Sequence, residues 1–284
     1  MINLNFKKGD VVGRISYGKD ILFVIKKIIR TSNGNKFAIL KGLTIRIEAD
    51  APIEDLELIE KQEVRNSIKN FDKKIEKRVN QWLKKTNSHR ILYKNDAYYT
   101  GKILHLDGDK KYAEKSQKYY KQLGLDAIVK NIPENKQAYY VYDLLERYEP
   151  DILVITGHDS MIKNGSNYND IYNYRNSRYF IKTVQEARKW MGKNGELVIF
   201  AGACQSFFEA LMSSGANFAS SPGRILIDFI DPLIVAEKVA LTSNTQFISI
   251  NEIAKDLKDG LKGIGGTSAQ GKKRLKLASK LYNK

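Results

Sequence analysis

Short runs that alternate apolar and polar residues occupy the first 60 positions of the chain. Such alternation between turn signals is typical of antiparallel strands. The pattern predicts strands at 11–12, 21–25, 37–40 and 43–47, with turns at 17–20 and 32–35. We therefore expect a small β-barrel module of SH3-like type over residues 1–60. Such a module either packs against the rest of the chain or binds a peptide or nucleic acid.

The hydrophobic pattern changes after residue 60. Residues 61–96 contain neither glycine nor proline and are rich in Lys, Glu, Gln and Asn. This composition predicts a charged helix followed by a linker. We place the domain boundary in this charged helical linker, so that residues 97–284 form a larger domain with a basic C-terminal tail.

From residue 97 onward, strand-like apolar runs alternate with helix-like segments. The pattern predicts strands at 102–107, 127–132, 152–156 and 197–201, and helices at 112–123, 136–148, 176–191 and 205–214. This alternation is typical of a mostly parallel sheet flanked by helices, with the functional site at the C-terminal ends of the strands. The predicted fold class is therefore α/β.

Composition narrows the compartment and the kinds of site. Of the 284 residues, 42% are hydrophobic, which is enough for a globular core. The one cysteine excludes intramolecular disulfides and zinc sites with several cysteines, and it is typical of a reducing, cytoplasmic environment. No apolar run approaches the roughly 20 residues of a membrane span, and Met1–Asp10 lacks a signal-peptide core. We expect a soluble, unsecreted protein without a membrane partner.

The net charge of +16 favours a different class of function, because strongly basic chains often bind nucleic acid. The basic residues are concentrated at 61–94 and 272–284. Runs of this kind are more typical of solvated helix faces and tails than of phosphate-binding surfaces. Nucleic acid is therefore an unfavoured but open partner. A non-catalytic basic scaffold that binds acidic proteins or nucleic acid is the alternative function.

Candidate chemistry begins with Cys204, which follows the apolar run 197–201 within the segment 202–206. A lone cysteine is most often a buried small hydrophobic residue. Small neighbours here allow a sharp turn, and the predicted helix at 205–214 would direct its N-terminal amides toward the sulfur. A cysteine nucleophile also needs a base, because a free thiol titrates at about pH 8.5.

His158 is the histidine placed to act as that base. It follows the run 152–156 directly, whereas His89 lies in a polar stretch and His105 lies within a strand as a core or supporting residue. If the two strands are neighbours, the thiol and the imidazole meet. The sequence thus predicts a Cys–His dyad, with His158 as base and Cys204 as the nucleophile that forms a thioester.

Four separated segments resemble the YabG family of sporulation-specific proteases of endospore-forming bacteria. They are Leu104–Asp109, Pro150–Asp159, Val198–Ser206 and Gly215–Pro222, and the start Lys8-Gly9-Asp10 resembles the family too. The resemblance implies a cysteine endopeptidase that processes spore coat and cortex-associated proteins. It also implies a location in the mother-cell cytoplasm, with association with the spore coat. No cofactor is implied.

The order of the dyad, histidine and then cysteine, each after a strand, also resembles that of caspase-like cysteine peptidases. In that group the two strands are adjacent, and the amide of a glycine after the histidine helps to form the oxyanion hole. Here Asp159 follows the histidine and Gly157 precedes it. Gly157, Asp159 and Ala203 are therefore the candidates for oxyanion stabilisation or for support of the dyad, beside the amide of Cys204.

The caspase-like resemblance also implies where the substrate residue before the cleaved bond (P1) would bind. Asp107 and Asp109 end the first strand of the unit, and carboxylates there favour Arg or Lys at P1. Asp228 and Asp231, later in the chain, are competing candidates for this pocket. Asp159 is a further candidate, either for the pocket or for orienting His158.

Each of these assignments has an alternative. Asp107-Gly108-Asp109 is a common turn sequence in which the acids bond local amides. The carboxylates of Asp107, Asp109 and Asp159 are a less favoured set of ligands for a divalent ion. A different thiol enzyme, such as an amidotransferase or an acyl transferase, would also use Cys204.

Overall fold

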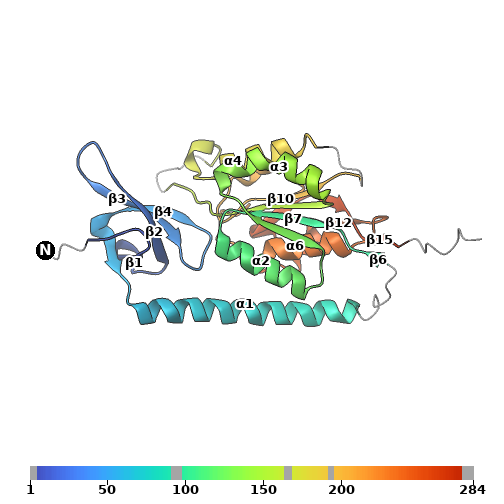
Figure 1. Ribbon diagram of the computed structural model, residues 1–284, viewed down its shortest axis with the longest axis horizontal. Helices are drawn as coiled ribbons and strands as arrows, with labels where there is room; N and C mark the ends of the chain where they lie inside the picture. Colours follow the sequence, from blue (N-terminus) through green and yellow to red (C-terminus); the bar gives the residue numbers. More distant parts are fainter. Residues whose placement is uncertain (1–4, 91–97, 163–167, 191–194, 277–284) are drawn as a thin grey trace, which may run out of the picture.

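The computed structural model describes residues 5–90, 98–162, 168–190 and 195–276. Its largest parts are an antiparallel sheet near the N-terminus and a mixed sheet flanked by helices, with the long helix α1 (Lys61–Arg90) running from the first to the second (Figure 1). Within the described residues, no helix combines the length and apolar character needed to cross a membrane. The predicted α/β class is confirmed, with a mixed sheet flanked by helices.

The N-terminal sheet has five antiparallel strands in the order β4-β3-β2-β1-β5. The strands are β1 (Val11–Arg14), β2 (Leu22–Arg30), β3 (Lys36–Gly42), β4 (Glu48–Pro52) and β5 (Leu56–Leu58), with 3₁₀ turns at Ile15–Tyr17 and Ile53–Asp55. Val12, Ile25 and Leu40 are among the side chains that form its core. Because β4 and β5 are the two edges of this order, closure into an SH3-like barrel stays a prediction.

The predicted strand at 43–47 is wrong, because these residues form the loop between β3 and β4. The Gly42 amide donates to the Ile47 carbonyl at 2.9 Å, which closes the loop at its base. A Cβ atom on Gly42 would lie 2.3 Å from the Ile45 carbonyl oxygen, so the turn needs glycine here. The 43–47 loop leaves the N-terminal sheet, and Ile47 forms an isolated parallel bridge with Asp159.

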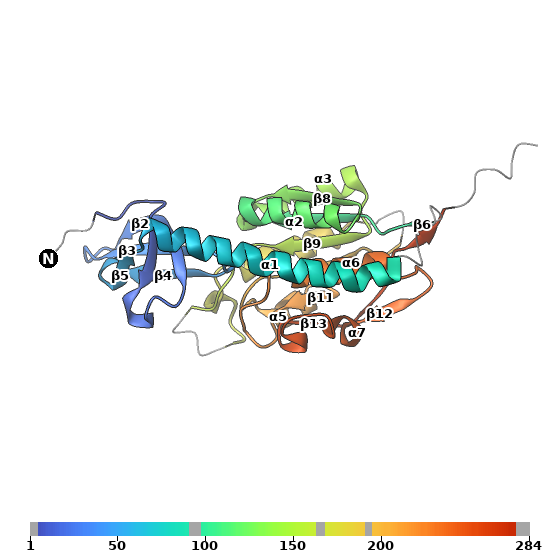
Figure 2. The same ribbon diagram turned by 90° about the horizontal axis from the view of Figure 1, so that it is seen from below.

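Helix α1 lies along the second part of the molecule, beside α2 and α6 (Figure 2). Ile75, Val79 and Trp82 on this helix are buried in the core that α2 and α6 also form. The segment predicted as a charged helical linker therefore carries an apolar stripe that packs against the mixed sheet part.

The mixed sheet has six strands in the order β13-β11-β10-β9-β7-β8, with β13 antiparallel to β11 and the other pairs parallel. The strands are β7 (Ile103–Asp107), β8 (Ala127–Asn131), β9 (Ile152–Thr156), β10 (Val198–Ala201), β11 (Phe218–Ser220) and β13 (Ile264–Gly266). Their near-continuous apolar runs are typical of parallel strands that are covered on both faces.

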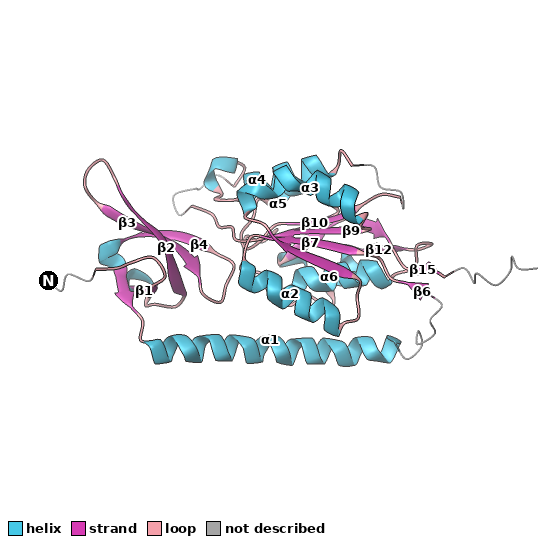
Figure 3. Cartoon of the chain, viewed as in Figure 1, coloured by secondary structure: helices cyan, strands magenta, loops and turns pink. Residues whose placement is uncertain are grey.

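Helices cover both faces of this sheet (Figure 3). One face carries α3 (Glu134–Tyr148), α4 (Ser177–Ala187) and α5 (Phe208–Ser213), and the other carries α2 (Lys110–Gln122), α6 (Asp231–Leu241) and α7 (Ile250–Ala254). Successive side chains of a strand point to opposite faces. Leu153 and Ile199 accordingly pack toward α3 and α4, and Val154 and Phe200 toward α2 and α6.

Two small sheets complete the fold. They pair β12 (Phe247–Ser249) with β14 (Ser268–Gln270), and β6 (Tyr98–Tyr99) with β15 (Arg274–Leu275), and 3₁₀ turns occur at Ile171–Asn173 and Gly260–Lys262. The Lys272 side chain is buried and donates to the Glu196 carbonyl at 2.6 Å. The first residues of the predicted basic tail are therefore packed, and residues 277–284 lie outside the described part.

Candidate active site

The two predicted dyad residues follow neighbouring parallel strands. Ile155 of β9 pairs with Ala201 of β10, and His158 and Cys204 each lie three residues beyond that pair. Both side chains are completely buried. Because paired parallel strands run at about 4.8 Å from each other, equal spacing beyond a pair brings the two residues to the same edge of the sheet. The sequence-based condition for a dyad, adjacency of the two strands, is met.

The His158 imidazole has an apolar neighbour on one side and an acid on the other. Its ring centroid lies 5.9 Å from that of Tyr112, and its Nδ1 lies 3.9 Å from Glu134 Oε1. Neither ring nitrogen has a hydrogen-bond partner among the described residues. Burial and then the positive charge of Lys41 lower the pKa of His158 well below its usual range. The imidazole is therefore neutral at pH 7 and can accept a proton.

The Cys204 thiol donates to the Ile227 carbonyl at a sulfur–oxygen distance of 3.9 Å. Burial raises the pKa of Cys204 to about 11, although backbone contacts with Ile227 and Arg46 and the charge of Arg46 act in the opposite direction. The raised pKa of the thiol and the lowered pKa of the imidazole leave both groups neutral at rest. A dyad of these two residues would therefore need proton transfer from sulfur to imidazole during nucleophilic attack.

The helix predicted at 205–214 starts later than expected. Helix α5 begins at Phe208, four residues after the cysteine, and spans six residues. Gln205 has a positive φ of 54°, and the Phe207 amide donates to Ser177 Oγ at 2.8 Å. The positive φ and this hydrogen bond hold 205–207 out of the helix, so the predicted start at Gln205 is wrong. The direction of the N-terminal amides toward the sulfur stays a prediction.

The Asp159 side chain holds together the loops around the dyad. It accepts hydrogen bonds from the Ser160 amide at 2.9 Å, the Asn176 amide at 2.8 Å, Ser206 Oγ at 2.8 Å and Ser177 Oγ. Burial raises the pKa of Asp159 to about 6 despite these bonds. Its carboxylate is thus a structural anchor, whereas its backbone amide faces the Arg46 carbonyl oxygen at 3.5 Å.

The other two oxyanion candidates are Ala203, whose amide already donates a hydrogen bond, and Gly157, whose missing side chain leaves space for Glu134. The Ala203 amide donates to Ser206 Oγ at 2.9 Å, so it is engaged in the turn rather than open to a substrate. Gly157 has a steric role, because a Cβ atom there would lie 2.5 Å from Glu134 Oε1. Of the three candidates, Asp159 is the one whose amide points at a carbonyl oxygen, that of Arg46.

Glu134 is a site residue that the sequence analysis did not find. Its carboxylate accepts from the His158 amide at 2.8 Å and lies where a Cβ atom on Gly108 would fall, 2.2 Å away. Burial raises the pKa of Glu134, and the bond from His158 opposes the rise. The available signal was an acid directly after Pro133, at the end of a strand. We predicted the helix from residue 136, two positions too late.

Asp107, like Asp231, is a fully buried member of the four predicted P1-pocket carboxylates. It forms an ion pair with Arg46 of the 43–47 loop, 2.8 Å from Nη2 to Oδ2, and accepts from Thr156 Oγ1 at 2.9 Å. Burial raises the pKa of Asp107, and the Arg46 guanidinium lowers it. Thr156 also bonds His105 Nε2 at 2.7 Å, which places His105 as the supporting core residue that was predicted.

The other three carboxylates already have partners. Asp109 pairs with Lys41 at 2.9 Å and caps α2 by accepting from the Lys111 amide at 2.8 Å. Burial raises the pKa of Asp109, but Lys41 and other groups bring it down to about 2. Asp228 and Asp231 both pair with Arg78 of α1, the former at 2.7 Å. Asp107 and Asp109 thus pair with Arg46 and Lys41 of the N-terminal part, whereas Asp228 and Asp231 pair with α1.

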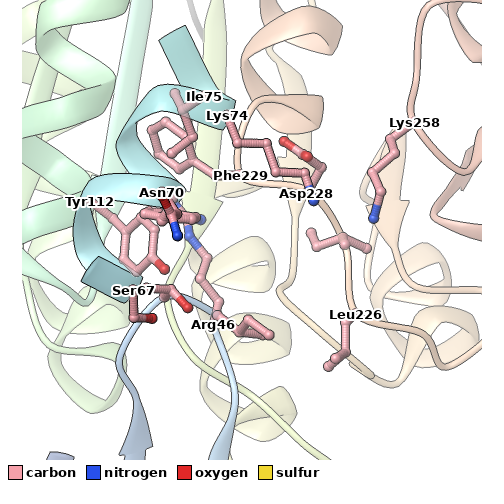
Figure 4. Close-up of a pocket in the computed structure, with 14 residues that line it drawn as sticks. Arg46, Ser67, Asn70, Lys74, Ile75, Tyr112, Leu226, Asp228, Phe229 and Lys258 are labelled. Atoms are coloured by element: carbon pink, nitrogen blue, oxygen red, sulfur yellow. The ribbon is translucent and has the colours of Figure 1, made fainter. Parts of the chain in front are cut away.

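A cavity of about 380 Å³ adjoins Arg46 (Figure 4). The Arg46 guanidinium lies 4.6 Å from the ring centroid of Tyr112 and 5.2 Å from that of Phe229. Asp228 and Lys74 are among the charged residues that line the cavity. No group of three or more His, Cys, Asp or Glu side chains in the described ranges is arranged to hold a metal ion.

Comparisons with known proteins agree over nearly the whole chain. A family model described as YabG peptidase U57 matches residues 7–278. The Bacillus subtilis (strain 168) protein named sporulation-specific protease YabG is 38% identical over 286 aligned positions, which cover 96% of this chain and 98% of that relative. No solved structure matches the chain.

Proposed function

The chain belongs to the YabG peptidase U57 family, and on that basis we propose that it is a sporulation-specific cysteine endopeptidase with Cys204 as nucleophile and His158 as base. Peptidase activity follows from the family, and the sporulation role is supported by the name of the Bacillus subtilis relative. The observation that carries the catalytic assignment is the equal position of the two residues beyond the paired strands β9 and β10.

In the proposed mechanism, His158 takes the thiol proton as the sulfur attacks the carbonyl carbon of the substrate. The backbone amides of Asp159 and Cys204 stabilise the oxyanion. His158 then protonates the leaving amine, and water hydrolyses the thioester to restore the thiol and release the acid. Glu134, 3.9 Å from Nδ1, favours the transient imidazolium by its charge.

The neighbouring positions of β9 and β10 in the sheet order support a caspase-like arrangement of the peptidase part. We propose that residues 97–284 form this part, that 61–96 include the helix packed along it, and that 1–60 form a separate small module.

We further propose that the enzyme cleaves after basic residues, with Asp107 as the carboxylate that binds P1. The existing ion pair between Asp107 and an arginine supports this preference. Its substrates would be spore coat and cortex-associated proteins, and it would act in the mother-cell cytoplasm and on the forming coat.

The test compares wild type with Cys204→Ala and His158→Ala on coat proteins extracted from spores, with mass spectrometry of every new terminus. We expect each variant to lower cleavage by about 10³-fold or more, since a dyad acts as a unit. Melting temperatures show whether the variants fold.

Two outcomes would redirect the assignment. If Cys204→Ala still cleaves coat proteins, the nucleophile is wrong. If no preparation cleaves, but wild type and Cys204→Ala bind coat proteins equally and lose affinity as salt is added, the chain acts as the basic scaffold.

A further inference from the structure

Arg46 lies in the candidate active site although it belongs to the N-terminal part of the chain. Its guanidinium pairs with Asp107 at 2.8 Å, and its carbonyl oxygen faces the Asp159 amide at 3.5 Å. Its backbone also forms a hydrogen bond that lowers the pKa of Cys204. A substrate arginine at P1 would make the same three contacts, through its side chain to Asp107, through its carbonyl oxygen to the Asp159 amide, and through its backbone to the Cys204 sulfur.

The burial of Arg46 is unusual for a residue with a purely structural role. The residue is 2% exposed, and its Nε and Nη1 atoms have no hydrogen-bond partner in the described part of the chain. Buried guanidinium groups are usually fully hydrogen bonded, because each unpaired donor costs free energy. Tyr112 and Phe229 provide aromatic faces for the cation instead, at 4.6 and 5.2 Å. An arginine held by one carboxylate between aromatic walls resembles a bound ligand.

The residues after Arg46 are also held against the active-site loops. Ile47 forms a parallel bridge with Asp159, and the Glu48 carbonyl accepts a hydrogen bond from Ser160 Oγ. The contacts of Asp159 with Arg46 and Ile47, and of Ser160 with Glu48, therefore fix the chain on both sides of the Arg46–Ile47 peptide bond.

We propose that the Arg46–Ile47 peptide bond is a self-processing site, an inference that rests on the proposed function. Cys204 Sγ attacks the Arg46 carbonyl carbon, its proton passes through His158 to the nitrogen of Ile47, and residues 1–46 are held as a thioester. Water then hydrolyses the thioester and returns a proton to the sulfur. The net reaction is hydrolysis of one peptide bond, with an arginine carboxylate and an isoleucine amine as new ends.

The experiment follows intact mass under denaturing conditions for wild type, Cys204→Ala, Arg46→Gln and Arg30→Gln. We expect wild type to give two pieces that end at Arg46 and begin at Ile47, with a rate that does not change on dilution. Cys204→Ala should stay whole. Loss of the Arg46–Asp107 pair should slow the cut by about 100-fold or more. Arg30, an exposed residue of β2, is the matched control, and its variant should be cut like wild type.

A reporter peptide with arginine at P1 separates this inference from the proposed function. If wild type cleaves the reporter while its own Arg46–Ile47 bond stays whole, self-processing is refuted and the peptidase assignment stands. If neither the reporter nor the chain is cut, both fail. Arg46→Lys keeps the charge and guards against misfolding. It should be cut faster than Arg46→Gln, and equal rates would overturn the role of the charge.

Discussion

Arg46 and Arg78 both join the first 90 residues to the mixed sheet part, and they do so in different ways. Arg78 of α1 pairs with Asp228 and Asp231, and Arg46 of the 43–47 loop pairs with Asp107. Both contacts lie near the ends of the strands and involve at least one fully buried carboxylate. The ion pairs alone would therefore assign the same structural role to both arginines.

Their surroundings distinguish them. Arg78 lies on a helix whose Val79 and Trp82 are buried, and the Trp82 indole donates to Glu237 Oε2 at 3.1 Å. That contact attaches the helix, with packing and polar bonds along its length. Arg46 instead brings its backbone to Cys204 and Asp159, and two of its guanidinium nitrogens have no partner in the described residues. Both arginines pair with a fully buried carboxylate, so the ion pair does not distinguish them. The contacts of the backbone do, because of the two only Arg46 has its backbone against the candidate catalytic residues.

The largest expected effect is on the attachment. Arg78→Met leaves Asp231 buried without its partner and should lower the free energy of unfolding by about 3 kcal/mol, as for other buried pairs that lose one member. Urea unfolding measures the change. Arg65→Met, at an exposed position of α1, should stay within about 0.5 kcal/mol of wild type. Equal destabilisation of the two variants would remove the structural role of Arg78.

The next effect concerns the carboxylate that binds Arg46. Asp107→Asn should lower kcat/KM for a reporter with arginine at P1 by about 100-fold, because a buried charge pair is lost. A reporter with glutamine at P1 should change little. Asp109→Asn, whose carboxylate is engaged by Lys41, is the control and should cost less than about fivefold on either reporter. Equal losses on both reporters in Asp107→Asn would show a general defect instead of P1 selection.

A smaller effect tests the packing of α1 without touching the ion pairs. Trp82→Phe keeps the ring but removes the indole donor to Glu237. We expect a loss of about 1–2 kcal/mol in the free energy of unfolding. The rate of cleavage at Arg46–Ile47 should be the same as in wild type. A variant with normal stability but slower cleavage would couple α1 to the chemistry and contradict the distinction drawn above.

The smallest effect is on the pH profile. His158 must be neutral to act as base, and burial lowers its pKa, so kcat/KM should fall only below pH 6.5, as the pH drops through that lowered pKa. Arg46 lowers and Asp109 raises the pKa of His158. Arg46→Gln should therefore move the acid limb to higher pH and Asp109→Asn to lower pH, each by less than about one unit. Shifts in the same direction would contradict this arrangement of charges.

Much of the mixed sheet could be predicted from the chain alone. β9 and β10 coincide with continuous apolar runs to within one residue, because strands buried on both faces leave a local signal. His158 and Cys204 were identifiable because each follows such a run closely. The family resemblance is confirmed by the match over residues 7–278.

The residues that complete the site left weaker signals. Arg46 meets Asp107 across 61 positions of sequence, and no periodic pattern encodes a contact of that range. Residues 43–47 alternate like a strand, but their contacts with the candidate site, such as those of Arg46 with Asp107 and of Ile47 with Asp159, hold them in a loop. The start of α5 was misplaced because the bond between Phe207 and Ser177 competes with helix formation.

The strand pairing of the N-terminal sheet determines whether the two pieces would separate after a cut at Arg46. Five residue pairs link β3 to β4, and three link β1 to β5. A piece that ends at Arg46 contains β1, β2 and β3. Its two edge strands, β1 and β3, would stay paired with β5 and β4 of the other piece. The nicked molecule would therefore sediment and elute like the uncut one. It would differ by two new opposite charges, a carboxylate and an ammonium, set beside the sulfur that made them.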